Sequence, residues 1–450
     1  MRQRIARLAL PAGSAVLALL VLLAVLATRG GAPDGTGTDG AGTDGAGAGA
    51  AERPVRTGPA PVTPLTVPAG YDTGRGWEAD GVSAEYAVAE AAGLIAYLER
   101  TGEHRYRLRT LHTAGGRPGW SGRPWRPLGG PDDTPRLLVV TKEDRQYFVT
   151  WSYGRAGGDP LSAADAFVSL DVYDAADGAR RRVEVPWADV PRVTGTGPGV
   201  LISDGRTRGT VVAPDTGEVT AVPPGRLGHP AGCAECRRLT ELRAVTSKGL
   251  LVSGARGFWV PGRWFSRGRP PAGADPASGV PASVTQGHVL ARWQPRKGTA
   301  RAATHDIWAV HDTATGRPLV KAECRRPAIE PGEQPRALVS PGGRYLIAGS
   351  LAFDLDARTG RCFEGADGAG PLTLATATDR GVVYGATGAR GAADALAGGG
   401  SPVAVDLATG VPRALAPNVR LPAAEVGGTG LFRWTDPRGR VHLTGYRWRG

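Results

Sequence analysis

The sequence predicts an all-β fold, and three observations support this prediction. A short turn motif recurs between residues 174 and 410, and each copy follows a run of alternating apolar residues. The glycines of these turns are spaced as expected for a repeated unit of a few strands. In addition, 68 Gly and 37 Pro among 450 residues interrupt the chain too often for long helices, because both residue types destabilise a helix interior.

The repeated motif reads D-x-x-T-G and is typical of a tight turn between two strands. Its clearest copies are Asp312 to Gly316, Asp356 to Gly360 and Asp406 to Gly410, with degenerate copies that end at Gly178 and Gly217. Glycine adopts the positive φ that a hairpin turn needs, and the Asp and Thr side chains can accept backbone N–H bonds. We therefore interpret these residues as structural. A metal or carboxylate site is disfavoured because each Asp lies in its own turn.

The spacing of the turns predicts a radial arrangement of about seven blades. The turn glycines at 178, 217, 316, 360 and 410 are 39, 99, 44 and 50 residues apart, and a propeller blade takes about 40 to 50 residues. The long interval predicts a hidden blade around Leu250–Ser253 and Gly257–Val260. A weak turn at Thr113–Gly116 and a last hairpin at Trp434–Gly439 complete the set. We expect a single propeller of four-stranded blades, with both termini sharing the blade that closes the ring.

Only one segment of the folded part allows a helical interpretation. Glu85–Arg100 is rich in helix-forming alanine, but Ala91-Ala92-Gly93 divides it into two short apolar runs. We predict two strands, Tyr86–Val88 and Leu94–Leu98.

The N-terminal 70 residues predict an anchor followed by a linker. Three arginines precede an uncharged run from Leu8 to Thr28, which is long enough to span a bilayer as a helix. Residues 1–29 are predicted to be a cytoplasmic stub and single-pass transmembrane helix; a cleaved signal peptide remains the alternative. The arginines place the rest of the chain outside the cell. Residues 30–70, rich in Gly and Ala and then Pro, are predicted to be a disordered linker, and residues 71–450 the extracellular propeller.

Four cysteines suit an oxidising exterior. Cys233 and Cys236 form a C-x-x-C pair, whereas Cys324 and Cys362 stand at the ends of predicted strands in consecutive repeats. Of the three possible pairings, we favour two disulfides, Cys233 with Cys236 and Cys324 with Cys362. Zinc binding and thiol redox chemistry remain weaker alternatives, since the second pair is widely spaced and no helix is predicted near the C-x-x-C.

The net charge of +12 indicates attraction to anionic partners. For an extracellular domain these are an acidic protein, phospholipid head groups or an anionic envelope polymer, and nucleic acid is not expected. The arginines are scattered along the chain, so the sequence does not show whether they gather on one face.

No catalytic motif or metal-binding spacing of histidines is found. His305 and Asp306 are the nearest acid and base pair, but neighbours on a strand point to opposite faces, so we interpret them as a polar strand end. Four tryptophans lie among Pro and Gly and are candidate partner anchors if exposed: Trp120, Trp125, Trp259 and Trp264. We expect no catalytic residue, no cofactor and no metal.

The repeats carry a family resemblance. Ala404-Val405-Asp406-Leu407-Ala408-Thr409-Gly410, together with Ser340-Pro341-Gly342-Gly343-Arg344-Tyr345-Leu346, resembles the pyrroloquinoline quinone-like and WD40-like β-propeller repeats. The whole chain resembles uncharacterised membrane-anchored actinobacterial propellers. Quinoprotein dehydrogenases of this fold carry adjacent cysteines and a Trp after most turns. Here no two cysteines are adjacent, and Val411-Pro412-Arg413-Ala414 lacks the Trp.

We therefore expect a monomeric, noncatalytic binding scaffold, tethered to the membrane, for a protein or an anionic envelope polymer. The alternative is a propeller enzyme, such as a quinone-dependent dehydrogenase or a hydrolase, with its site at the central channel.

Overall fold

The computed structural model describes residues 56–58, 61, 63–82, 85–130, 133–156, 165–327, 334–365 and 370–450. Residues 53–450 form one compact unit. The predicted membrane segment and residues 30–55 of the predicted linker lie outside the described residues. In the part that is described, no helix has the length and apolar character needed to cross a membrane. The anchor and its topology therefore stay predictions.

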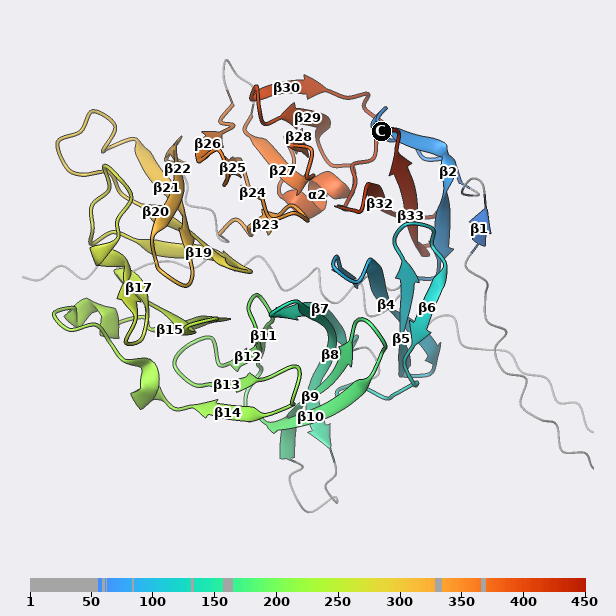
Figure 1. The fold of residues 1–450 in the computed structure, drawn as a ribbon, viewed down its shortest axis with the longest axis horizontal. Helices are drawn as coiled ribbons and strands as arrows, with labels where there is room; N and C mark the ends of the chain where they lie inside the picture. Colours follow the sequence, from blue (N-terminus) through green and yellow to red (C-terminus); the bar gives the residue numbers. More distant parts are fainter. Residues whose placement is uncertain are drawn as a thin grey trace, which may run out of the picture. The chain divides into compact units, whose positions relative to one another are not determined.

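The described part of residues 53–450 is an all-β propeller of eight blades, as Figure 1 shows. Seven blades are four-stranded antiparallel sheets whose strands follow one another in chain order, and the eighth has five strands. We number the blades along the chain, and blade 8 is the one that combines both ends of the unit. The all-β propeller prediction is confirmed, whereas the predicted number of seven blades is wrong.

The first four blades contain sixteen consecutive strands, with the first strand of each blade nearest the centre in Figure 1. Blade 1 consists of β3 (Tyr86–Ala89), β4 (Leu94–Gly102), β5 (Arg105–His112) and β6 (Pro118–Ser121); blade 2 of β7 (Arg136–Lys142), β8 (Arg145–Ala156), β9 (Asp165–Asp174) and β10 (Arg180–Pro186); blade 3 of β11 (Arg192–Thr194), β12 (Val200–Ser203), β13 (Gly209–Val212) and β14 (Val219–Val222); blade 4 of β15 (Glu241–Thr246), β16 (Gly249–Gly254), β17 (Gly257–Val260) and β18 (Trp264–Phe265).

The remaining blades complete the ring. Blade 5 consists of β19 (Val280–Thr285), β20 (His288–Trp293), β21 (His305–Asp312) and β22 (Pro318–Arg325); blade 6 of β23 (Leu338–Val339), β24 (Tyr345–Ala348), β25 (Leu351–Asp354) and β26 (Thr359–Cys362); blade 7 of β27 (Leu372–Ala377), β28 (Val382–Thr387), β29 (Ser401–Asp406) and β30 (Val411–Ala414); blade 8 of β31 (Ala424–Val426), β32 (Thr429–Thr435), β33 (Val441–Trp448), β2 (Tyr71–Asp80) and β1 (Arg56–Gly58). Short helices lie in the loops: η1 (Pro224–Leu227), η2 (Ala234–Arg237), η3 (Ser266–Gly268) and α2 (Ala392–Leu396).

Several local predictions are confirmed. Glu85–Arg100 forms strands β3 and β4 rather than a helix, and the hidden blade is blade 4, whose strands β16 and β17 cover the two predicted runs. These runs are apolar at successive positions because the middle strands of a blade are covered on both sides. In β24, for example, Leu346 packs in a cluster with blade 5 and the adjacent Ile347 packs in a cluster with blade 7.

The hydrophobic core is divided among the blade junctions. The described residues form eight buried clusters, and each contains side chains from two neighbouring blades. The last of these joins blade 8 to blade 1 through Trp77, Ile95 and Leu443. The ring is therefore closed by apolar packing that is continuous around it.

A second contact recurs between neighbouring blades and involves the repeated turn. A side chain from the fourth strand of one blade lies on the turn glycine of the next blade and donates a hydrogen bond to a carbonyl of that turn. Trp264 lies on Gly316 in this way and donates from its indole N–H to the Thr313 carbonyl at 3.0 Å. The equivalent pairs are Trp77 with Gly116, Trp120 with Gly178, Arg181 with Gly217 and Arg361 with Gly410.

Blade 8 confirms that both termini share the closing blade. Its strand order is β1-β2-β33-β32-β31, so β2 from the start of the unit pairs antiparallel with β33 from the end of the chain. The predicted hairpin at Trp434–Gly439 joins β32 to β33 and therefore belongs to this blade. The third and fourth strands of blade 8 are β33 and β2, which lie at opposite ends of the chain, so the repeated turn between third and fourth strands is missing from this blade.

The folded part also begins earlier than the predicted boundary at Tyr71. β1 pairs with β2, and Leu65 and Val67 pack against the cluster between blades 7 and 8. The backbone N–H of Leu65 donates to the Tyr446 hydroxyl at 3.2 Å. A proline-rich segment can pack in an extended conformation through a few side-chain contacts with the blade beside it. Amino-acid composition alone does not show whether such contacts form. The described end of the predicted linker is thus part of the propeller.

The contact on the turn glycine predicts a specific steric effect. Gly316 has φ +70°, and a Cβ placed there would lie 2.5 Å from the Trp264 ring. Gly287 has φ +77°, but a Cβ there would have no neighbour within 4 Å. We expect Gly287→Ala to destabilise by about 1 kcal/mol through backbone strain alone, and Gly316→Ala by about 2 to 4 kcal/mol because overpacking adds to that strain. Denaturant unfolding of both variants tests this, and equal losses would contradict it.

His311 supports the same turn from inside blade 5. Its side chain is fully buried, its Nδ1 lies 3.1 Å from the Gly316 carbonyl, and its Nε2 accepts the Trp293 indole N–H at 3.2 Å. Both bonds require the neutral imidazole with the proton on Nδ1. Burial lowers the pKa of His311 to about 4, since desolvation disfavours the charged ring.

This pKa predicts a loss of stability in mild acid. The folded-state pKa is below the ordinary 6.5, so the contribution of His311 is complete above pH 6.5 and falls as the pH drops through 4. The loss should be on the order of 3 kcal/mol. Unfolding free energies measured between pH 7 and 4 should fall less steeply in His311→Gln than in the wild type. Equal slopes for the wild type and His311→Gln would contradict the prediction.

Candidate binding face

The loops of the propeller lie on two faces. The turn face carries the loops between first and second strands and between third and fourth strands. The opposite face carries the loops between second and third strands and those between blades; we call it the basic face. Contacts within each set support the division. Lys142 pairs with Asp215 at 2.6 Å on the turn face, and Arg208 pairs with Asp189 at 2.7 Å on the basic face.

The predicted turn residues lie on the turn face, each in its own turn. The Asp312 carboxylate accepts bonds from the Thr315 N–H at 2.7 Å and the Thr315 hydroxyl at 2.6 Å, and Gly316 has a positive φ. Asp406 accepts a bond from the Ala408 N–H at 2.9 Å, and Gly410 also has a positive φ. These aspartates therefore hold turns and do not converge on a shared site.

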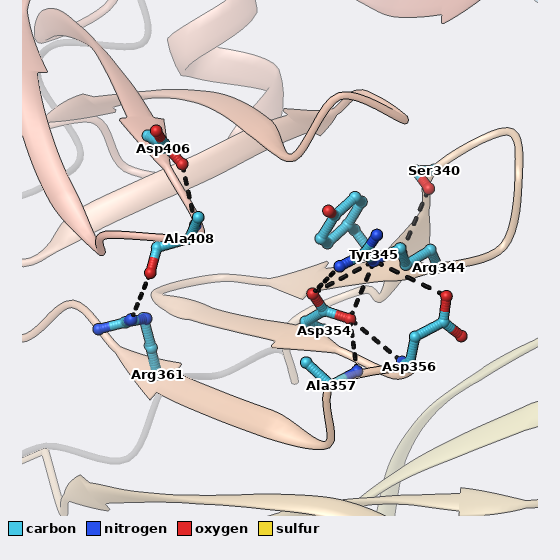
Figure 2. Close-up of polar contacts among 9 residues, drawn as sticks. All are labelled: Ser340, Arg344, Tyr345, Asp354, Asp356, Ala357, Arg361, Asp406 and Ala408. Atoms are coloured by element: carbon cyan, nitrogen blue, oxygen red, sulfur yellow. Dashed lines mark hydrogen bonds and ion pairs between the residues drawn. The ribbon is translucent and has the colours of Figure 1, made fainter.

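The turn of blade 6 differs from the predicted one, as Figure 2 shows. Asp354, rather than Asp356, accepts the backbone bonds, from Asp356 at 3.1 Å and Ala357 at 2.9 Å. Arg358 takes the positive φ of 54°, and Gly360 lies within β26. Hydrogen bonds from Arg344 lower the pKa of the Asp354 carboxyl, which keeps it ionised. The turn starts two residues before the motif because Asp354 ends β25.

The candidate catalytic and metal-binding groups have structural roles in the described residues. Asp306 is buried and pairs with Arg326 at 2.8 Å. The one group of potential metal ligands found there is Cys324, Cys362 and Glu364, and its two cysteines are joined in a disulfide. The four candidate tryptophans are largely buried in strands or blade junctions, so they offer no exposed aromatic anchor.

The cysteines form the two pairs preferred from the sequence. Cys233 and Cys236 bridge the loop that leads from blade 3 to blade 4, and Cys324 and Cys362 join β22 of blade 5 to β26 of blade 6. The second disulfide therefore links two neighbouring blades covalently.

The described loops of the two faces differ in charge. On the basic face, arginine and lysine clearly outnumber aspartate and glutamate, whereas on the turn face the two signs are about balanced. Part of the excess lies beside blades 3 and 4 in four exposed arginines, and another part lies in the β20–β21 loop of blade 5. We call this set the arginine cluster: Arg206, Arg237, Arg238 and Arg256. None of the four forms an ion pair with a described carboxylate, although other arginines of this face, such as Arg208, do so.

Backbone bonds hold the loops of the arginine cluster together. The Arg206 carbonyl accepts a bond from the Leu242 N–H, and the Arg238 carbonyl accepts one from the Ala255 N–H, both at 2.8 Å. The Cys233–Cys236 disulfide closes the loop that carries Arg237 and Arg238. Leu239 follows at φ +52° with 81% of its surface exposed, a strained position for a large apolar residue. The cluster is thus a set of exposed arginines on loops whose backbones are held together, with Glu235 in the same loop and one protruding apolar side chain.

Comparison with known proteins adds little to this description. No protein-family model matches the chain, and no curated protein matches it. Among solved structures, the crystal structure of the computationally designed Ika8 protein aligns with a TM-score of 0.39 and 10% identity, covering 84% of this chain and 98% of Ika8. A likeness at this level carries no functional argument, so the candidate site rests on its own geometry.

The disulfides allow a test of their unequal contributions. Cys324 and Cys362 are 38 residues apart, whereas Cys233 and Cys236 are separated by three. Because a longer closed loop restricts the unfolded chain more, replacing Cys324 and Cys362 with alanine should destabilise by about 3 to 4 kcal/mol, and replacing Cys233 and Cys236 by about 2 kcal/mol. Denaturant unfolding of the two double variants gives the free energy that each one loses. A larger loss for the Cys233 and Cys236 variant than for the Cys324 and Cys362 variant would contradict the prediction.

Proposed function

We propose that this protein is a noncatalytic binding scaffold that holds an anionic partner on its basic face. The observation that carries the proposal is the arginine cluster, whose four guanidinium groups are exposed and form no ion pair with described residues. Surface arginines that serve only solubility need no fixed arrangement, whereas these are held by backbone bonds and a disulfide. Arginine also binds carboxylate and phosphate oxygens in a planar, two-point geometry.

The strained Leu239 supports the same surface. A non-glycine residue in the left-handed region persists only where its surroundings impose it, and such positions often belong to functional sites. Here the side chain projects beside Arg237 and Arg238 and can add apolar contact to a mainly electrostatic interface.

The proposed setting follows from the sequence. We propose a membrane-tethered, extracellular monomer related to the pyrroloquinoline quinone-like or WD40-like repeat propellers, without a bound cofactor. Its partner is an anionic envelope polymer or an acidic protein, and the polymer is favoured because its repeated charges can engage several separate guanidinium groups at once. A flexible tether would keep the basic face near envelope components while the ring stays rigid.

Binding should depend on where the arginines lie and not only on net charge. Residues 53–450, which form a compact unit with their own core clusters, are titrated with poly-glutamate and with polyphosphate by isothermal titration calorimetry. Arg206→Ser, Arg238→Ser and Arg256→Ser combined should weaken binding at least tenfold. Affinity should also fall steeply as salt rises to 0.5 M, because exposed charges are screened.

A matched variant keeps this test specific. Arg117→Ser, Arg263→Ser and Arg317→Ser remove the same charge from exposed positions in turn-face loops, and they should change the affinity less than twofold. Equal losses in the two triple variants would show attraction to net charge alone, which would refute a binding face. Failure of the wild type to bind either polymer would refute the anionic partner.

A further inference from the structure

A cavity of about 500 Å³ opens between blades 1 and 2, away from the arginine cluster. Three segments of the basic face surround it: the β4–β5 turn, the loop from β6 to β7, and the end of β8. The residues that line it include Glu103, His104, Arg126, Leu128, Gly129 and Arg155. The cavity therefore draws on two blades and brings together residues that are distant in sequence.

His104 is the unusual residue of this cavity. Its side chain is 95% buried, since only 5% of its surface is exposed, yet neither ring nitrogen has a hydrogen-bond partner. Its backbone is in the left-handed region, with φ +51°. A buried polar group without a partner is destabilising, and a histidine at positive φ adds strain. Both ring nitrogens are covered by neighbouring atoms, so the two unfavourable features point to a turn that shifts when a ligand enters the cavity and brings His104 into contact with it.

Backbone contacts fix the segments that carry the two cations of the cavity. Trp125, next to Arg126, exchanges backbone hydrogen bonds with Tyr106 at 2.8 and 2.9 Å. The Leu128 N–H donates to the Ser152 hydroxyl at 3.0 Å. A Cβ at Gly154 would lie 2.4 Å from the Gly129 nitrogen, so a glycine there lets the loop approach β8 directly beside Arg155.

The charges of the cavity indicate the ligand. Arg126 and Arg155 are exposed and form no ion pair with a described residue. The Asp133 carboxylate accepts the Gly130 N–H at 2.7 Å and is not among the residues that line the cavity. Glu103 at the rim offsets one of the two positive charges. The remaining charge suits a singly charged oxygen anion better than a doubly charged one, because a second negative charge would face Glu103 without a matching cation.

We propose that this cavity is a binding site for a singly charged oxyanion, a carboxylate or a phosphodiester, held by Arg126 and Arg155 and contacted by His104. The inference rests on the proposed function, because the site would receive one charged group of the same anionic partner. A carboxylate and a phosphodiester each present two oxygens that a guanidinium can bind. The experiment distinguishes the two groups with separate probes.

The test uses small probes with residues 53–450. Glucuronate carries a carboxylate and dimethyl phosphate a phosphodiester, whereas glucose is neutral and glycerol 3-phosphate carries a second charge. Calorimetric titration should show binding of at least one singly charged probe, no binding of glucose, and weaker binding of glycerol 3-phosphate. Arg126→Ser and Arg155→Ser should each reduce the affinity at least tenfold.

His104→Asn tests the histidine without losing the turn, because asparagine tolerates a positive φ. This substitution should lower the affinity for the singly charged anion at least threefold. Glu143→Asn is the matched control, because Glu143 also has a positive φ, of 55°, but lies in the β7–β8 turn on the other face. This variant should bind the anion with wild-type affinity. Thermal unfolding confirms that each variant is folded.

Two outcomes would overturn the inference: no preference of the wild type for a singly charged probe over glucose, or full affinity in Arg155→Ser. Polymer binding that depends on the arginine cluster, with no small anion bound at the cavity, would reject the cavity site and leave the proposed function standing. Small-anion binding without polymer binding would reject the proposed function and keep the site.

Discussion

The ring depends on the contact between the fourth strand of one blade and the turn glycine of the next. At five junctions a Trp or Arg side chain covers the glycine and donates a hydrogen bond to the turn. The turn must therefore have a fixed backbone and no side chain at that point. This requirement is confined to the turn face, so the loops of the basic face can differ in length and charge without disturbing the junctions.

Closure places a second constraint on the chain. Buried clusters at the junctions form a continuous series, and each middle strand contributes to two of them, as Leu346 and Ile347 show. A blade cannot be removed without exposing the clusters on both sides. The disulfide between Cys324 and Cys362 reinforces one junction covalently, while blade 8 is held by hydrogen bonds between β2 and β33 and by apolar packing.

Much of this architecture follows from local sequence, because strands, turns and their spacing are local properties. The sequence correctly predicts the turns at Asp312 and Asp406, the strands on either side of Gly93 and the hidden fourth blade. The hairpin at Trp434–Gly439 belongs to the eighth blade, but the register of β33 with β2 is not a local property, because these strands meet only when the ring closes. The shift from Asp356 to Asp354 also depends on where β25 ends, which pairing with β24 decides.

The residues of the two candidate sites could not be predicted from the sequence. Arg206, Arg238 and Arg256 belong to three separate loops, and an arginine-rich chain gives no sign of which ones gather. His104, Arg126 and Arg155 come from two blades and match no motif. The one local signal was the two-residue turn Glu103–His104 between strands, where a histidine in place of Gly or Asn is unusual. Strain at that position becomes visible only with the backbone.

The shared blade also determines how mechanical load enters the molecule. Any tension on the N-terminal part of the chain reaches the ring first through β1 and then through β2. β2 is also the strand that seals the ring against β33. A sustained pull would therefore peel the outer edge of blade 8 before it stressed the covalently linked blades 5 and 6. The seam that completes the propeller is thus also the place where force would open it.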